Sequence, residues 1–216
     1  NPELLAFLEK ELAASRYDLK HIYRLILNSK TYQLSAVPKV KHPDGEAHFA
    51  YYPIRRLDAE VLIDALNQMT GTKEEYTSAI PEPFTFIPDG QRSIALPDGS
   101  ITSSFLEMFG RPSRDTGLLS ERNNIPSPAQ RLHLLNSSHV RRKLREGKAF
   151  QPLLDGKGGH RGAATELYLT ILSRFPTQEE LAIAKAYGES GEAKGAEALA
   201  DLAWALINST EFLYRH

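Results

Sequence analysis

Apolar residues recur every three or four positions along much of this chain, and this spacing predicts α-helices that each bury one face. Two such stretches lie before residue 30, and a third begins near Asp58 and ends at Gly71. Further stretches run over residues 102–109, 162–174 and 194–212. The sequence lacks the alternating pattern of a series of strands, so it predicts an all-α fold, an irregular multi-helix bundle with long loops.

Polar residues mark where two of the later helices begin. Ser127 precedes Pro128 and is followed by Gln130, and Thr177 is followed by Glu180 at the same spacing. In such a capping box, the first side chain accepts a hydrogen bond from the third helical N–H, and the third side chain reaches back. The sequence therefore predicts helices that begin directly after Ser127 and Thr177.

Residues 71–101 break the helical spacing. Two turn signals, Pro88-Asp89-Gly90 and Pro97-Asp98-Gly99, lie on either side of the short run Ser93-Ile94-Ala95-Leu96. The pattern predicts an irregular loop excursion that carries one short β-hairpin at about 85–100.

One short motif occurs three times, at residues 27–32, 135–140 and 207–212. Each copy has an apolar residue, then Asn and Ser, then two variable residues and a second apolar residue. Asn tolerates the left-handed conformation that closes a helix, and Ser can cap the turn that follows. We interpret each copy as a corner between two helices; an Asn/Ser ligand triad is the alternative.

The composition narrows the classes of protein. With 216 residues, 41% of them hydrophobic, the chain can bury a sizeable core, and we expect a single helical domain over 1–216. It begins with a helix start, Asn1-Pro2, and no leader, so we expect it to be a fragment of a larger protein. No apolar stretch approaches the roughly 18 residues of a membrane span.

Charge and residue type argue against several chemistries. The 26 basic residues nearly balance the 27 acidic ones, and the basic run 141–145 has no interleaved aromatic residues, so we expect no nucleic-acid partner. The absence of Cys excludes thiolate ligands and covalent c-type haem within this stretch. His42 and His48 are six residues apart, as are His133 and His139, not the four that place two imidazoles on one helical face. We therefore expect no metal site and no cofactor in this domain.

The most polar segment is the loop over residues 109–124, which contains three arginines, Arg111, Arg114 and Arg122. A guanidinium pairs well with a carboxylate, so an internal lattice of ion pairs that ties this loop to the helices is one interpretation. The other is an anion or sugar pocket in which the same donors face outward. Arg55 and Arg56 can join either arrangement.

The pocket interpretation assigns roles to particular residues. Its ligand-binding candidates are Arg55, Arg56, Arg111, Arg114, Arg122 and Gln130. Glu121 or His133 would carry a proton in this alternative only. A cluster buried in mutual contacts would argue against such a site, whereas side chains lining an open cleft would favour it.

Residues 52–60 read Tyr-Pro-Ile-Arg-Arg-Leu-Asp-Ala-Glu, which resembles the Arg-Arg-Leu-Asp-Ala-Glu signature of the planctomycete-specific domain of unknown function, the DUF-1553 type. Residues 109–122, 129–136, 169–177 and 202–212 are similar to further blocks of the same family. The family occurs in Planctomycetes, Verrucomicrobia and their relatives. The resemblance spans nearly the whole chain and is weakest over the loop excursion at 71–101.

The resemblance implies a context more than an activity. Such domains lie at the C-terminal end of large exported proteins, behind a partner domain of unknown function and often a cytochrome-c-like domain, and the family supplies no catalytic residues. We therefore expect a non-catalytic accessory or scaffold domain of an extracytoplasmic protein, periplasmic or secreted, that docks onto cytochrome-c-like or glycan-handling domains. The alternative is a carbohydrate- or anion-binding domain or a hydrolytic enzyme with its pocket around Arg111–Arg122 and His133.

Overall fold

The structure is a computed structural model that describes residues 1–78, 80, 86–96, 101, 103–112, 119–123, 125–155 and 159–215, without the side chains of 119 and 159–161. Arg114, one of the candidate residues, lies outside the described residues. The chain divides into two compact units, Asn1–Arg55 and Arg56–Arg215, and each is described by itself. The single domain over 1–216 stays a prediction.

The first unit contains two helices, α1 (Pro2–Ala14) and α2 (Leu19–Leu27), which contact each other. Asn1 caps α1 by accepting the Leu4 N–H at 3.1 Å, and Asp18 caps α2 by accepting the Lys20 N–H at 2.9 Å. Both starts follow from the capping preference of Asn and Asp and confirm the two helices expected before residue 30. No residue of either helix is buried.

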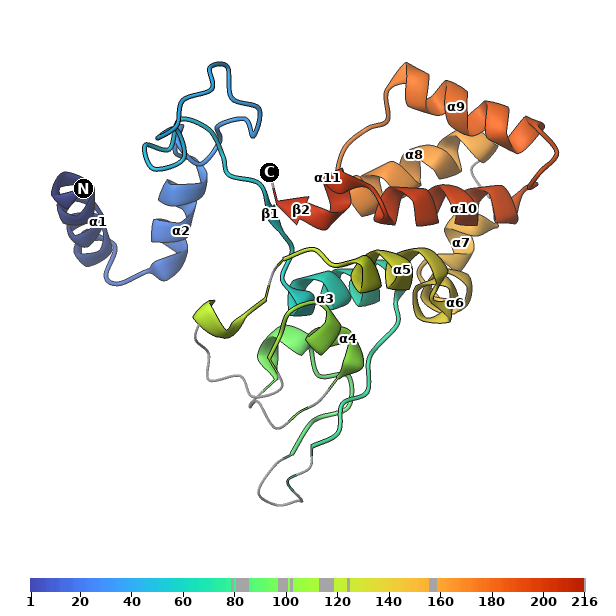
Figure 1. Cartoon of the computed structure of the whole chain (residues 1–216), viewed down its shortest axis with the longest axis horizontal. Coiled ribbons are helices and arrows are strands. Elements are labelled where there is room, and N and C mark those ends of the chain that lie inside the picture. The colour runs from blue at the N-terminus through green and yellow to red at the C-terminus, as the bar shows by residue number, and fades with distance from the viewer. Residues whose placement is uncertain are drawn as a thin grey trace. The chain divides into compact units, whose positions relative to one another are not determined.

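The second unit is also mostly helical (Figure 1). Its elements in chain order are β1 (Arg55–Arg56, whose first residue belongs to the first unit), α3 (Ala59–Thr70), the 3-10 turn η1 (Ser93–Ala95), α4 (Ser104–Met108), the 3-10 turn η2 (Leu119–Glu121), α5 (Pro128–Asn136), α6 (Ser138–Glu146), α7 (Gln151–Leu154), α8 (Gly159–Leu172), α9 (Gln178–Glu189), α10 (Ala196–Ile207), α11 (Thr210–Leu213) and β2 (Tyr214–Arg215).

The hydrophobic core of the second unit lies where α3, α6, α8 and α10 meet. Leu62 and Leu66 of α3, Val140 of α6, Leu167 of α8 and Ile207 of α10 are completely buried in it. Gly71 closes α3 in the left-handed conformation, with φ 69°, as the sequence predicts. Among the described residues, every helix falls short of the length and apolar content that a membrane crossing requires.

The all-α fold class is confirmed, with one short pair of strands. These strands are β1 and β2, and not residues near 85–100, where the described residues form η1. The reason is Asp64 of α3, whose carboxylate accepts the backbone N–H groups of Ser93 and Ile94 at 2.8 and 3.1 Å. This contact fixes the loop as a turn on α3. The excursion is closed at its base by a bridge between Ser78 and Ile101.

The repeated Asn-Ser motif forms helix corners, as predicted, but Asn acts differently from the expectation. Asn28 and Asn208 are right-handed, with φ −87° and −85°, and each donates its amide to the carbonyl four residues earlier. The side chain therefore closes the last turn while the backbone remains helical. Ser29 and Ser209 then accept a backbone N–H of the following turn. In the middle copy, Ser137 caps α6.

Candidate functional site

The buried carboxylate of Glu60, in the first turn of α3, contacts two arginines of the polar loop. Arg122 donates to both of its oxygens, Nη1 to Oε2 and Nη2 to Oε1, each at 2.7 Å. Arg111 places its Nε 3.6 Å from Oε1. The side chains of Glu60 and Arg111 are only 4% and 5% exposed. Because a two-pronged guanidinium pair is strong and directional, these contacts tie both ends of the loop to α3.

Arg56 makes a second set of buried contacts next to the first. Its Nη1 donates to Oε1 of Gln130, and its Nη2 donates to the carbonyl of Phe109 at 2.8 Å. Gln130 in turn donates to the carbonyl of Met108 at 2.7 Å and accepts the N–H of Ser127 in the predicted capping box. Burial lowers the pKa of Arg56. One side chain, Gln130, therefore both starts α5 and connects it to β1 and α4.

The structure thus brings four of the predicted ligand-binding residues into one place. We call Arg56, Glu60, Arg111, Arg122 and Gln130 the Arg–Glu cluster. All of its members except Arg122 are buried, and Arg122 is half-buried. Its guanidinium groups face Glu60, Gln130 and a backbone carbonyl. The cluster therefore resembles the internal lattice of ion pairs more than the anion or sugar pocket. Arg55 and Glu121 are exposed.

A family profile described as "PSD1: Protein of unknown function (DUF1553)" matches residues 1–188. The chain belongs to this family. No curated protein and no solved structure matches the chain.

Three of the five blocks that resemble the DUF1553 family meet in the Arg–Glu cluster. Arg56 and Glu60 come from the Arg-Arg-Leu-Asp-Ala-Glu signature, Arg111 and Arg122 from the block over 109–122, and Gln130 from the block over 129–136. The first of these segments is separated from the other two by about 50 residues in the sequence. Their meeting point joins α3, α5, β1 and the polar loop.

A second polar cluster lies at the other end of α3, around the ammonium group of Lys143. The Lys143 Nζ lies 2.5 Å from Oε1 of Glu74 and donates to Asn67 at 2.6 Å and to Thr72 at 3.2 Å. His139 bonds the same Glu74 oxygen at 2.9 Å. We call these five residues the Lys143 cluster. Burial alone would raise the pKa of Glu74, but hydrogen bonds from His139 and Lys143 outweigh it and lower this pKa to about 2.

This cluster changes the interpretation of the basic run 141–145. Lys143 and Leu144 are buried against α3, and only Arg141, Arg142 and Arg145 are exposed. The run is therefore not a uniform solvated face. It divides into a structural lysine and three outward arginines.

His133, the other candidate proton carrier, lies half-buried on α5 among aromatic rings. Its ring centroid is 5.6 Å from that of Phe105, 6.0 Å from that of Phe109 and 5.7 Å from that of His139. Its Nε2 is buried and has no hydrogen-bond partner among the described residues. Burial, and secondarily the charge of His139, lowers the pKa of His133. The imidazole therefore packs as a neutral ring at neutral pH.

The described residues of the second unit line, among other surfaces, a polar hollow and an apolar one. One is polar, about 430 Å³, and is lined by the Lys143 cluster residues Thr72, Glu74, His139 and Lys143 with charged neighbours. The other is apolar, about 1050 Å³, and lies between α9 and the helices α8 and α10. Neither hollow is lined by the Arg–Glu cluster, Glu121 or His133. Among the described residues, no three His, Asp or Glu side chains are grouped to hold a metal ion.

Sequence reasoning missed the carboxylates and the amide on which these clusters depend. Glu60, Asp64 and Asn67 lie at positions i, i+4 and i+7 of α3, so they share one flank of its buried face. A polar stripe beside an apolar stripe was the available signal. Each member binds a different segment: the polar loop, η1 and α6, respectively.

Proposed function

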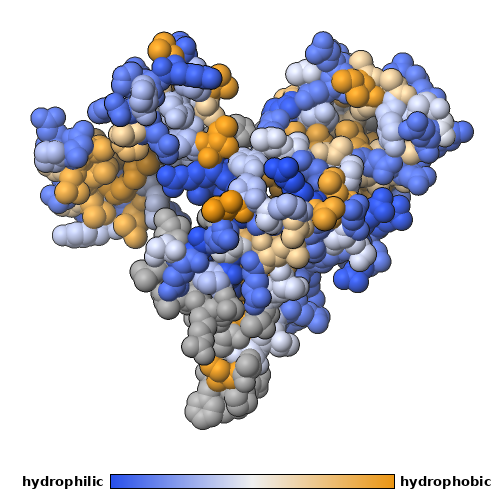
Figure 2. Space-filling model, viewed as in Figure 1, coloured by the Kyte–Doolittle hydropathy of each residue, from blue (hydrophilic) through white to orange (hydrophobic). Residues whose placement is uncertain are grey.

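We propose that this chain is a non-catalytic accessory domain that docks onto other domains of the same polypeptide. The observation that carries the proposal is the exposed apolar face of α1 and α2. Leu4, Leu5 and Leu19 are 53%, 59% and 62% exposed, and Phe7 and Tyr23 are also exposed. Figure 2 shows apolar side chains gathered over α1. Contiguous apolar surface of this kind marks a protein contact.

The state of the conspicuous polar residues supports the same proposal. Arg56 donates through both Nη atoms to Gln130 and to the Phe109 carbonyl, while its buried Nε has no hydrogen-bond partner among the described residues. Arg122 and Arg111 face Glu60, and Gln130 donates to the Met108 carbonyl. Groups engaged in this way hold elements together and are not presented to a substrate. A structural role therefore accounts for the polar residues that the sequence analysis considered as candidates for a binding site.

The proposed partners follow from the family resemblance. We expect cytochrome-c-like or glycan-handling domains of an exported, extracytoplasmic protein, with any cofactor held by the partner. Apolar helix faces supply the contact that such a scaffold needs, because burial of apolar surface drives most domain association.

Hydrogen exchange tests the docking proposal directly. The amides of residues 1–27 are compared in this chain alone and with the adjoining domains of its polypeptide present at tens of micromolar. We expect slower exchange in α1 and α2 on addition of the partner, and a loss of this protection in Leu5→Ser. Ile125→Ser is the matched control, because Ile125 is 75% exposed in the other unit. Unchanged exchange throughout residues 1–27 would contradict the proposal.

The alternative is a carbohydrate- or anion-binding domain or a hydrolytic enzyme around Arg111–Arg122 and His133. It has less support from the geometry, because Arg111 and Arg122 face a buried carboxylate and His133 faces aromatic rings. Isothermal titration with sulfate and with short oligosaccharides tests it, since binding that is lost in Arg122→Gln with the fold intact would favour this alternative.

A further inference from the structure

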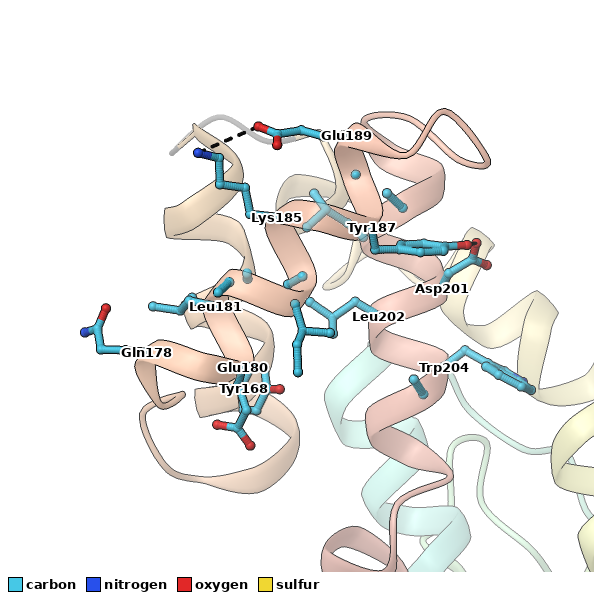
Figure 3. A pocket seen from close by; sticks show the side chains of 18 of the residues that line it. Tyr168, Gln178, Glu180, Leu181, Lys185, Tyr187, Glu189, Asp201, Leu202 and Trp204 are labelled. Carbon is cyan, nitrogen blue, oxygen red and sulfur yellow. Dashed lines mark hydrogen bonds and ion pairs between the residues drawn. The ribbon is translucent and has the colours of Figure 1, made fainter.

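The apolar hollow beneath α9 is a feature of the second unit to which no role has yet been assigned. Leu181 and Ala184 of α9 line one side, and Tyr168 of α8 and Leu199 and Leu202 of α10 line the other. Figure 3 shows Leu181 and Leu202 in the space between the helices. Interiors of proteins are close-packed, and voids much larger than a water molecule are rare in them. A hollow of about 1050 Å³ between three helices needs a structural cause.

That cause is a polar contact at each end of α9. At its start, Arg174 donates to both oxygens of Glu180, at 2.9 and 2.7 Å, and also to Glu211. At its end, the Tyr187 hydroxyl donates to Asp201 of α10 at 2.8 Å, and Figure 3 shows these two side chains beside each other. Between the two contacts, no residue of α9 is buried. The helix is thus held at both ends, and its residues between the two contacts remain at least partly exposed.

The lining of the hollow selects an apolar occupant. Ligand pockets are typically concave and mostly apolar, with a few polar groups that fix orientation, and their volumes reach about 1,000 Å³. Water that fills an apolar space of this kind is readily displaced by hydrocarbon. The shape and lining therefore match a small molecule with an extended apolar part.

The charged side chains at the rim indicate which charge the polar end of a bound molecule should have. Two acidic rim residues are paired with cations, Glu180 with Arg174 and Glu189 with Lys185 at 3.7 Å. The third, Asp201, accepts a hydrogen bond from the neutral Tyr187 hydroxyl and keeps its charge. Arg141 of α6 also lines the hollow, is exposed, and has no carboxylate of the described residues within 4 Å. The rim thus presents a guanidinium that is available to an anion, and guanidinium forks bind carboxylate and phosphate well.

We propose that the hollow beneath α9 binds an amphipathic anion, with its hydrocarbon part between Leu181 and Leu202 and its carboxylate or phosphate head at Arg141. This is a binding site of the chain's own, separate from docking through α1 and α2.

The only tryptophan of the chain, Trp204, lines the hollow and reports binding by its emission. The whole chain is titrated with dodecanoate and with dodecyl phosphate below their micelle-forming concentrations. We expect a saturable change of Trp204 emission with both, and the tighter of the two identifies the head group. Dodecanol should bind about tenfold more weakly, and dodecyltrimethylammonium more weakly still, because neither satisfies the guanidinium.

Two variants, each with a matched control, localise the site. Arg141→Gln should weaken dodecanoate binding three- to tenfold and leave dodecanol unchanged, whereas Arg145→Gln, an exposed arginine on the same helix, should change neither. Ala184→Phe fills the middle of the hollow and should abolish binding of all probes. Ala186→Phe is its control, because Ala186 is exposed on α9 and does not line the hollow. Circular dichroism confirms that each variant is folded.

Three results would overturn the proposal. The first is a Trp204 emission that stays constant with both anions. The second is equal binding of dodecanoate by Arg141→Gln and the parent chain, or by Ala184→Phe and Ala186→Phe. The third is protection of α9 amides by a partner polypeptide and by none of the amphiphiles, which would assign the groove to a protein helix.

Discussion

Glu60 and Glu74 show how much of this structure depends on single carboxylates. Glu60 holds the two arginines that bracket the polar loop, and Glu74 holds Lys143 and His139 of α6. In both cases the partners come from distant segments and are largely buried. Removing one member of such a set leaves a buried charge without compensation, which destabilises a protein far more than the loss of a surface pair.

The substitution Glu60→Gln should lower the free energy of unfolding by about 3 kcal/mol, because the buried Arg111 and the half-buried Arg122 then lose the negative charge of Glu60. Urea denaturation followed by circular dichroism measures the change. Glu107→Gln on α4 is the control, since Glu107 is exposed, and should alter stability by less than about 0.5 kcal/mol. Equal midpoints for the two variants would contradict the structural role of the cluster.

The pKa of Glu74 predicts an acid-sensitive contribution to stability. This pKa is lowered from 4.5 to about 2 on folding, so the contribution is complete above pH 4.5 and is lost as the pH falls toward 2. Its size is at most about 3 kcal/mol. Urea midpoints measured from pH 7 to pH 2.5 should fall more steeply for the parent chain than for Glu74→Gln. Parallel curves would show that Glu74 does not titrate in this way.

At the scale of elements, local signals predicted the ends of helices well. Both capping boxes formed, at Ser127–Gln130 and Thr177–Glu180, because a cap needs only residues three positions apart. The loop over 85–100 was harder, because Asp64 on α3 decides its conformation. Turn signals depend on neighbouring residues, so they cannot predict a contact with a carboxylate about 30 residues earlier in the chain.

Gly147, which follows α6, lies against the C-terminal end of α3. A Cβ at this position would lie 2.5 Å from the Lys143 carbonyl and 2.8 Å from the Thr70 Cβ. Gly147→Ala should therefore lower the free energy of unfolding by about 3 kcal/mol through overpacking. Gly162→Ala in α8 meets nothing within 4 Å and should stabilise by up to about 1 kcal/mol, as the better helix former. Thermal denaturation compares the two, and a stable Gly147→Ala variant would show that α3 and α6 can move apart.

At the scale of the whole molecule, the sequence predicted the fold class and the family. It did not predict which residues pair with each other in the candidate site. Arg122 and Glu60 are 62 residues apart, and Lys143 and Asn67 are 76 apart. Such pairings depend on how helices pack, which no local spacing contains. The sequence did group Arg56 with Arg111 and Arg122, since it offered an ion-pair lattice of these arginines as one interpretation, whereas it named Gln130 only for the pocket.

The hydrophobic core lies entirely between Ala59 and Phe212. A fragment of residues 56–216 should therefore unfold cooperatively, with a urea midpoint within about 0.3 M of that of the full chain, because a unit with its own core can fold alone. Tyrosine and Trp204 fluorescence follow the transition. A broad or missing transition would mean that residues 1–55 complete the core.

The attachment of Arg111 and Arg122 to one carboxylate has a consequence for engineering. Arg111 and Arg122 both contact Glu60 of α3. Extra residues placed between the two arginines would lengthen the connection while both of its ends stay attached to α3. Loop closure becomes less favourable by only about 0.6 kcal/mol for each doubling of length. The interval from 112 to 120 is thus a natural place to insert an affinity tag or a fluorescent reporter while the helices keep their arrangement.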